Sequence, residues 1–429
     1  MTATWRPTTA LLRAALVSVL LAALAVVLGR PDLLVLATPL LVHAVACVVR
    51  RPVEVPTATG TLGVGAVREG EGTTYRVDLE HTDAVEHAVT AVGRHRWTVL
   101  RPANGVVSAT ASGAGRMRLA MAMASTRWGV RPLGDGLVAA TSAWAGWQWG
   151  PVRLPMRTLT TLPLPGRFDS RAPAPHPIGL VGTNPARRPG DGSELASIRP
   201  FQPGDRLRRV QWRVSLRTRT IHVTSTVAEQ DASVLLVVDS GVEVGESGGL
   251  HGLASSLDIA VRAAGAVAEH YLHRGDRVGL RMLGSTRQSA LSPAAGRRHL
   301  RAVLETLARV VPGESAGLDP TRMRFRVSAG SVVIVFSPLL SHTAVVTITT
   351  LASRGLDVVV VDTLPEELDI GDDRRRALAW RMRLLEREDV IGRVRRHGIP
   401  VVAWHGPGTL DQILVQLGRR GSRPRPVAR

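Results

Sequence analysis

The chain has 429 residues, 45% of them hydrophobic, which is enough for two or three domains with packed cores and excludes wholesale disorder. Its 54 basic residues are all arginine and outnumber the 35 acidic ones, so the formal net charge is +19. One cysteine excludes a disulfide framework, a cysteine-rich zinc site and an iron–sulfur cluster held by this chain alone, and 3% aromatic residues argue against a stacking platform for single-stranded nucleic acid.

Two apolar runs stand near the N-terminus, at residues 14–29 and 33–49, and a polar break containing Pro31 separates them. Each run is at the short end of what spans a bilayer, and Arg13 can lengthen the first run by snorkelling. Residues 1–52 are therefore predicted to form a transmembrane helical hairpin.

The arginines around these runs predict an orientation. Arg6, Arg13, Arg50 and Arg51 flank the outer ends, whereas the turn carries Arg30 alone. The positive-inside rule then places both ends in the cytoplasm. We expect a multi-pass protein of the cell membrane whose large C-terminal part is cytoplasmic, with the lipid bilayer as one partner.

Two other readings of the N-terminus are weaker. A cleaved signal peptide lacks an A-x-A site at the right distance after the first run. A lipoprotein signal ending at Cys47 would have Ala44 three residues earlier, which fits such a site poorly. His43, inside the second run, is either a functional intramembrane group or a tolerated polar residue near a helix interface.

Residues 53–165 have the texture of a β-sandwich-like module. The predicted strands are residues 74–80, 97–100, 105–111, 116–122 and 137–144. Short strands at regular spacing with turn residues between them are typical of such modules. Trp144, Trp147 and Trp149 are interpreted as core and edge packing, with a ligand box as the alternative. Residues 167–192 are rich in proline, glycine and arginine and are predicted to be a linker.

From residue 233 onward, strand and helix patterns alternate. Strands are predicted at residues 233–238, 277–282, 331–336, 357–361 and 399–404, and helices at 253–272, 300–311, 343–354, 374–397 and 409–417. This order predicts an α/β fold with an open, mostly parallel sheet and helices on both faces. Ligands bind such sheets at the carboxyl ends of the strands, where Asp239, Ser337 and Asp362 lie.

The motifs of several enzyme classes are missing from the sequence. It contains no G-x-x-x-x-G-K-[ST], no G-x-G-x-x-G after a strand, no H-E-x-x-H and no G-x-S-x-G. The lack of lysine alone excludes a Walker-type ATPase. His270 and His273, beside Glu269, are interpreted as a solvated or interface face.

The segment at residues 194–229 stands out. Its Pro-Gly-Asp turn at 203–205 combines a fixed φ, a permissive glycine and a capping aspartate. Asp205 and Arg208 could pair on the first turn of a helix, with Trp212 one turn further along the same side. The segment is interpreted as a strand–turn–helix clamp against the sheet, and an anion or partner site is the alternative.

This segment resembles the signature of a bacterial family called domain of unknown function fifty-eight, L-R-x-Y-x-x-G-D-x-x-R-x-I-x-W-x-x-S-A-R. The residues that match it in register are Arg199, Gly204, Asp205, Arg208, Trp212, Ser215 and Arg217. Phe201, Val210 and Leu216 replace its tyrosine, isoleucine and alanine. The order of membrane spans, β-rich region, signature and α/β domain agrees as well, so the resemblance covers nearly the whole chain.

The resemblance implies that the α/β domain is von Willebrand factor A-like. We expect five segments: the hairpin 1–52, the β-rich module 53–165, the linker and signature 166–232, the A-like domain 233–418 and a basic tail 419–429. The matching signature residues are then candidates for partner binding.

An A-like domain that binds a metal carries D-x-S-x-S after its first strand. In this chain Gly241 and Glu243 occupy the two serine positions after Asp239, and Ser337 stands where an aspartate often does. Asp239 and Glu243 alone could still hold Mg²⁺ through waters. The main expectation is a docking surface without a cofactor, and Mg²⁺ at this degenerate site is the alternative.

The resemblance implies action with a MoxR-type AAA+ ATPase in the assembly or maturation of other complexes. The leading hypothesis is a non-enzymatic, membrane-anchored scaffold or adaptor whose A-like domain docks protein partners. The alternative is a surface protein for anionic lipid or nucleic acid, based on the charge of +19 and the arginine-rich tail, although arginines scattered along the chain predict no specific nucleic acid. A hydrolase or metalloenzyme using Asp239, Glu243 and Asp362 has no base–nucleophile pair in its favour.

Overall fold

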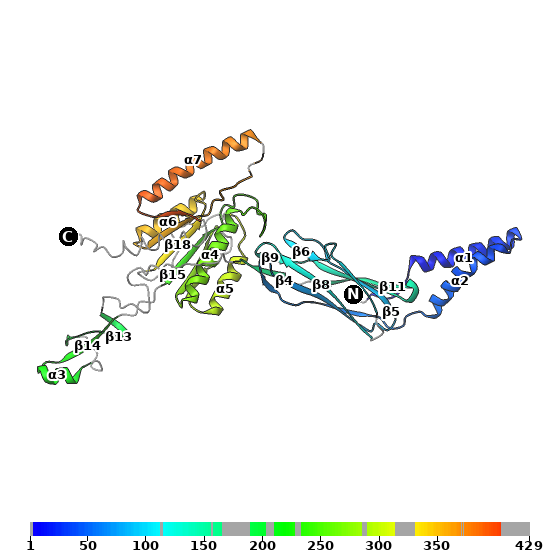
Figure 1. The fold of residues 1–429 in the computed structure, drawn as a ribbon, viewed down its shortest axis with the longest axis horizontal. Helices are drawn as coiled ribbons and strands as arrows, with labels where there is room; N and C mark the ends of the chain where they lie inside the picture. The colour runs from blue at the N-terminus through cyan, green and yellow to red at the C-terminus, as the bar shows by residue number, and fades with distance from the viewer. Residues whose placement is uncertain are drawn as a thin grey trace. The chain divides into compact units, whose positions relative to one another are not determined.

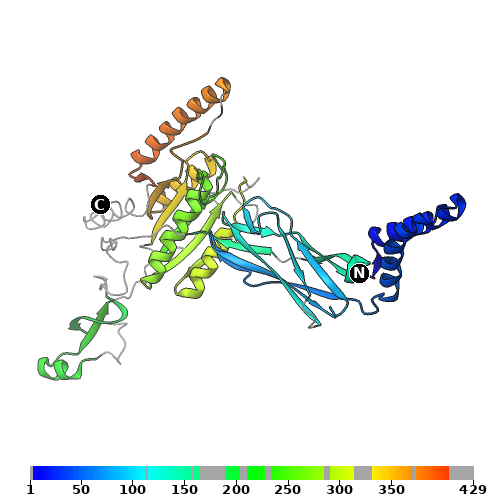
Figure 2. The same cartoon turned by 45° about the vertical axis from the view of Figure 1, so that its right-hand side comes forward.

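The computed structural model divides the chain into two compact units, Met1–Leu162 and Pro163–Arg429. Each unit is described by itself (Figures 1 and 2). The residues that the structure describes are 3–111, 115–155, 158–164, 189–202, 210–227, 233–284, 290–313, 331–369, 371 and 373–404. The predicted helix 409–417 and the basic tail 419–429 lie outside these residues.

The first unit begins with two antiparallel helices, α1 (Thr9–Leu28) and α2 (Asp32–Val49) (Figure 1). Thr8 caps α1, because its Oγ1 accepts a hydrogen bond from the N–H of Leu11 at 3.2 Å. Gly29 ends the helix in the left-handed region, at a φ of 61°. Both helices are long and apolar enough to cross a membrane, and little of either is buried within the unit. The predicted hairpin is present, and its composition suggests membrane anchoring.

The β-rich module follows the hairpin. Its sheets have the strand orders β1-β11-β10-β5-β7, β2-β4-β8-β6 and β3-β12-β9. The bounds are β1 (Arg6–Pro7), β2 (Thr57–Leu62), β3 (Ala66–Arg68), β4 (Gly72–Glu80), β5 (Val85–Ala91), β6 (Thr98–Arg101), β7 (Val106–Thr110), β8 (Arg116–Ser125), β9 (Gly129–Pro132), β10 (Asp135–Ser142), β11 (Trp147–Pro155) and β12 (Thr158–Leu162), with a 3₁₀ turn η1 (Ala143–Ala145) before β11. Every strand predicted in this region has a counterpart, and the structure adds others, among them β2, β5 and β11.

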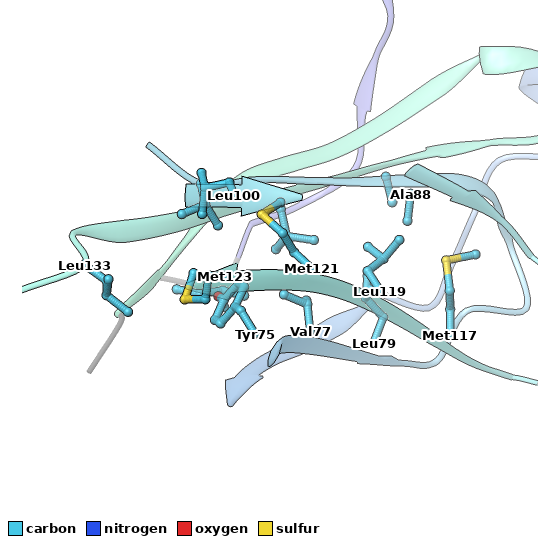
Figure 3. Packing of buried hydrophobic residues seen from close by; sticks show 14 of the residues in the cluster. Tyr75, Val77, Leu79, Ala88, Leu100, Met117, Leu119, Met121, Met123 and Leu133 are labelled. Atoms are coloured by element: carbon cyan, nitrogen blue, oxygen red, sulfur yellow. The ribbon is translucent and has the colours of Figure 1, made fainter. Parts of the chain in front are cut away.

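The sheets of this module share one hydrophobic core. Alternate residues of β4 and β8 point inward, as the two-residue period of a strand requires. Figure 3 shows Val77, Leu79, Met117, Leu119, Met121 and Met123 facing this core, with Ala88 of β5 packing against them from the other large sheet. The two large sheets therefore enclose a common core, as in a sandwich.

Tyr75 of β4 is packed between two glycines. A Cβ added at Gly60 would lie 2.6 Å from the Tyr75 hydroxyl, and one at Gly136 would lie 2.5 Å from it. Within the described part of the chain, this buried hydroxyl has no hydrogen-bond partner, and burial raises the pKa of Tyr75 above its ordinary value. The two glycines are needed because the tyrosine ring occupies the space that side chains would take.

Tryptophans join the hairpin to the β-rich module. The indole N–H of Trp147 donates to the carbonyl of Cys47, in the last turn of α2, at 2.8 Å. The indole N–H of Trp149 donates to the carbonyl of Ala3 at 3.1 Å. The predicted packing role is confirmed for these two side chains, whereas Trp144 is 49% exposed.

The second unit begins with a small antiparallel arm formed by β13 (Pro189–Pro200) and β14 (His222–Val227), with the short helix α3 (Trp212–Thr218) between them in sequence. The linker prediction for 167–192 is wrong at its end, because β13 already begins at Pro189 and pairs with β14. The backbone of β13 pairs with that of β14, which satisfies its hydrogen-bonding groups. The proline- and glycine-rich sequence did not indicate this pairing.

The remainder of this unit contains a six-stranded sheet with the order β17-β16-β15-β18-β19-β20. Neighbouring strands run parallel except β17, which is antiparallel to β16 and was not predicted. The bounds are β15 (Ser233–Asp239), α4 (Ser256–His273), β16 (Arg277–Leu283), β17 (Ala290–Ala294), α5 (Arg297–Ala308), β18 (Val332–Ser337), α6 (His342–Ser353), β19 (Asp357–Asp362), α7 (Arg374–Arg396) and β20 (Val401–Ala403). The predicted mixed α/β architecture with a mostly parallel sheet is present.

Helices cover both faces of this sheet. The chain leaves β15 in one direction through α4 to β16, and leaves β18 in the other direction through α6 to β19. Because crossovers between parallel strands are right-handed, the two helices lie on opposite faces. Ala344, Ile348 and Leu351 of α6 and Val394 of α7 belong to one core cluster with alternate residues of β15, β18 and β19.

Candidate functional site

The carboxyl ends of β15, β18 and β19 meet at one edge of the sheet. Ser337 ends β18 and pairs in register with Asp362, which ends β19. Asp239 ends β15, and the Ser337 hydroxyl donates to its Oδ2 at 2.7 Å. The structure therefore brings together the three residues that the strand pattern placed at this edge.

The Asp239 carboxylate holds the start of the β15–α4 loop through hydrogen bonds. It is buried, and its Oδ1 accepts a hydrogen bond from the N–H of Gly241 at 3.0 Å. With Ser337 on the other oxygen, the carboxylate joins two strand ends and the first turn of the β15–α4 loop. A buried carboxylate needs such donors, because burial without them would favour its neutral form.

Glu243 is tied to the start of α4. The hydroxyl of Ser255, the N-cap residue of α4, donates to Glu243 Oε1 at 2.6 Å. The same hydroxyl accepts from the N–H of Asp258, whose carboxylate accepts from the N–H of Ser255 in a capping box. Negative charge at a helix N-terminus is favourable because it faces the positive end of the helix dipole. Glu243 thus stabilises the start of the helix.

Asp362 is held by an arginine that the strand pattern did not identify. Arg387, in the middle of α7, donates through Nη2 to Asp362 Oδ2 and through Nε to the carbonyl of Pro338 at 2.7 Å. The other carboxylate oxygen of Asp362 accepts from the N–H of Leu364 at 3.0 Å. Arg387 is buried, although most residues of α7 are exposed. One guanidinium therefore joins the ends of β18 and β19 to α7.

The predicted metal ligands are both engaged in these local contacts. Asp239 accepts from Ser337 and Glu243 accepts from Ser255, and Gly241 offers no side chain at the first serine position. Throughout the described ranges, no group of three or more His, Cys, Asp or Glu side chains is arranged to hold a metal ion. This donor set fits Mg²⁺ poorly, because Mg²⁺ demands near-ideal octahedral oxygen ligation. An ion at Asp239 and Glu243 stays a prediction.

Next to this edge lies an open groove of about 440 Å³ between the β15–α4 loop and the first half of α7. Val244 and Gly245 line it from the loop, and Trp380 and Arg383 line it from α7. Gly245 has a φ of 81°, and a Cβ there would lie 3.0 Å from a methyl carbon of Leu368. Glycine is needed at this position for both reasons.

The outer face of α7 carries an apolar stripe, which consists of Leu378, Met382 and Leu385 with exposed fractions of 60%, 58% and 65%. The residues are spaced at i, i+4 and i+7, so they lie on one side of the helix. Arginines alternate with them, and no acidic residue occurs between Arg374 and Leu385. The stripe was not predicted, because the many arginines in this segment make the helical spacing of its apolar residues hard to recognise in the sequence.

The signature residues lie on the arm. Arg199 on β13 pairs in register with Val223 on β14. Ser215 is buried in α3, where its hydroxyl donates to the carbonyl of Gln211 at 2.8 Å and accepts from the N–H of His222 at 2.8 Å. Ser215 thus joins α3 to β14. Gly204, Asp205 and Arg208 lie outside the described residues, and so does the predicted pairing of Asp205 with Arg208.

The same helix presents apolar side chains outward. Trp212 begins α3 and is 65% exposed, and Leu216, one turn later, is 78% exposed. Arg213 and Arg217 belong to the same short helix and are exposed too. Exposed tryptophan beside arginine is a combination typical of interface hot spots.

Comparisons with known proteins agree with part of the resemblance. A family model described as "Protein of unknown function DUF58" matches residues 197–376. This range includes the described part of the signature, the carboxyl edge of the sheet and the first residues of α7. Uncharacterized proteins of Mycobacterium bovis and Mycobacterium tuberculosis are each 32% identical to this chain over 132 residues, which is 30% of this chain and 40% of each relative. The chain therefore aligns with less than half the length of these relatives.

Proposed function

We propose that the protein is a non-enzymatic, membrane-anchored adaptor whose second unit docks a protein partner. The observation that carries this proposal is the exposed pair Trp212 and Leu216 on α3, inside the segment that the family model matches. A tryptophan and a leucine that remain in water make a helix face whose apolar surface a partner can cover.

The α/β part supports the same proposal. Its strand order, with antiparallel β17 at one edge, supports a von Willebrand factor A-like fold, which serves as a docking module. Asp239, Glu243 and Asp362 hold strand ends, a helix cap and α7 together through their hydrogen bonds. These structural roles favour docking over a hydrolase or metalloenzyme. A MoxR-type AAA+ ATPase is the partner that the family resemblance implies.

The membrane part of the proposal rests on the hairpin. The two helices expose most of their apolar side chains and are long enough to span a bilayer. The arginine distribution favours a cytoplasmic second unit, where an ATPase would be accessible.

The test uses the full-length protein in the membranes of its own host. A photo-crosslinking residue at Arg217, beside Leu216 on α3, is expected to capture an AAA+ ATPase. The double variant Trp212→Ala, Leu216→Ala should reduce this capture at least tenfold, because it removes the apolar contact.

The matched control is the double variant Leu378→Ala, Leu385→Ala, which removes similarly exposed apolar surface from α7 of the same unit. It should retain capture at Arg217. Equal losses in both double variants, or no ATPase captured by the wild-type chain, would contradict the proposal.

A further inference from the structure

An open apolar groove with a volume of about 390 Å³ lies between the hairpin and the β-rich module. Leu11 and Ala15 of α1, Val45 and Val48 of α2, and the indole of Trp147 contribute to its lining. Its other lining residues are apolar too, so this volume offers no hydrogen-bonding side chain except the Trp147 N–H, which already donates to Cys47. Such a groove suits a hydrocarbon chain and excludes a polar ligand.

Two arginines lie at the same end of the hairpin, directly after α2. The guanidinium carbon of Arg51 lies 5.1 Å from the ring centroid of Trp147, which is itself a lining residue of the groove. That of Arg50 lies 4.9 Å from the ring centroid of Trp144. Both distances are in the range of cation–π contacts, which hold the two charges beside the groove.

The end of the groove is held in place by hydrogen bonds between the hairpin and the module. The Thr8 hydroxyl donates to the carbonyl of Ala145 at 2.6 Å, and the Thr8 N–H donates to the carbonyl of Gly146 at 3.0 Å. A Cβ at Gly146 would lie 2.6 Å from Cys47 Sγ, so the turn before Trp147 packs directly on α2. The groove and the arginines beside it therefore belong to one fixed arrangement.

We propose that this groove binds one phospholipid with an anionic headgroup. An acyl chain occupies the apolar volume, and Arg51, with Arg50 next to it, binds the headgroup phosphate. Arginine binds phosphate oxygens through its planar fork of N–H donors. Tryptophan is enriched at the level of the headgroups, and arginines directly after a membrane span attract anionic lipids. The proposal rests on membrane insertion of the hairpin, which is part of the proposed function.

The test is native mass spectrometry of the full-length protein, released from bilayers that contain equal amounts of phosphatidylglycerol and phosphatidylcholine. The wild-type chain should retain one phosphatidylglycerol in preference to phosphatidylcholine. Arg51→Gln should reduce this preference about fivefold, because one charge near an anionic headgroup is lost. Ala15→Leu, which fills part of the groove, should reduce the retention of both lipids.

Arg30→Gln is the matched control, because Arg30 lies in the turn at the opposite end of the hairpin and pairs with Asp32 at 3.2 Å. It should leave the preference unchanged. Equal retention of the two lipids by all variants would overturn the proposal, as would a second chain or another protein found on the hairpin in place of lipid.

Fractionation of cells that produce the full-length protein separates this proposal from the one on which it rests. A wild-type chain that washes off membranes would contradict membrane anchoring itself. A chain that stays in membranes without a lipid preference would contradict only the lipid site.

Discussion

Two long helices of the second unit, α4 and α7, belong to the same α/β part but differ in how much of each is buried. Thirteen of the eighteen residues of α4 are buried, whereas only Arg387 and Val394 are buried among the twenty-three of α7. Small side chains let α4 approach β15, β16 and β18 closely, and its alanines are in contact on nearly every side. Figure 1 shows α4 against the sheet and α7 extending beyond it.

The difference concerns what each helix can do. Burial of apolar surface stabilises α4, so it is part of the core of the unit. In α7 the contacts to the body come from Arg383, Arg387 and the second half of the helix, whereas most of the first half lines a groove or carries the apolar stripe. Regions with few buried contacts open at lower free energy. We therefore expect α7 to be the more mobile helix and α4 the rigid one.

The largest expected effect comes from the core of α4. Leu257→Ala removes a buried side chain in its first turn and should lower the free energy of unfolding by about 3 kcal/mol, through lost burial and a cavity. Leu378→Ala on the exposed face of α7 should change it by less than about 0.5 kcal/mol. Urea denaturation of the full-length protein measures the free energy of unfolding of both variants. Unfolding is monitored by hydrogen exchange in peptides from the α/β part of the second unit. Similar losses would refute the distinction between the two helices.

A slightly smaller effect should come from the buried arginine of α7. Arg387→Met leaves the Asp362 carboxylate without its guanidinium and should cost about 2–3 kcal/mol, since an unpaired charge remains near the protein interior. Arg381→Met, at an exposed position of the same helix, should cost less than about 0.5 kcal/mol. Hydrogen exchange in α7 should rise in the first variant alone, and unchanged exchange there would mean that Arg387 does not hold the helix.

The helix caps give a third comparison. Ser255→Ala removes the cap of α4 and the hydroxyl bound to Glu243, and should cost about 1–2 kcal/mol. Asp373→Ala removes the cap of α7, where Asp373 accepts from the N–H of Arg375 at 2.9 Å. Because this cap is exposed, we expect a cost of about 0.5 kcal/mol. Hydrogen exchange should become faster in α7 alone. A global destabilisation by Asp373→Ala would show that α7 is as cooperative with the core as α4.

The smallest expected change is an increase in the free energy of unfolding. The Thr363 hydroxyl, directly after β19, is fully buried and has no hydrogen-bond partner within the described ranges. Thr363→Val should raise the free energy of unfolding by up to about 1 kcal/mol, because the unpaired hydroxyl is replaced by a methyl group. Thr347→Val on α6 is the control and should destabilise, since Thr347 donates to the carbonyl of Thr343 at 2.7 Å. A loss in Thr363→Val would indicate that its hydroxyl has a partner in solution.

Part of the candidate site could be predicted from the order of elements. Apolar runs that end in Asp239 and Asp362, with helices between them, predict parallel strands whose ends meet. The bond between Ser337 and Asp239 follows from that geometry. Arg387 could not be predicted, because it is one of many arginines in α7 and only the packing of that helix buries it.

The sequence by itself determined the apolar hairpin, the β-rich region before the α/β region, and the signature segment around Trp212 and Ser215. These features are local, since periodicity and turn residues act over a few neighbouring positions. Only the tertiary structure decided that Trp147 donates to Cys47, one hundred residues away, or that Glu243 faces a helix cap rather than solvent. Such pairings depend on how finished elements pack, and many residues of the same type compete for each place until packing selects one.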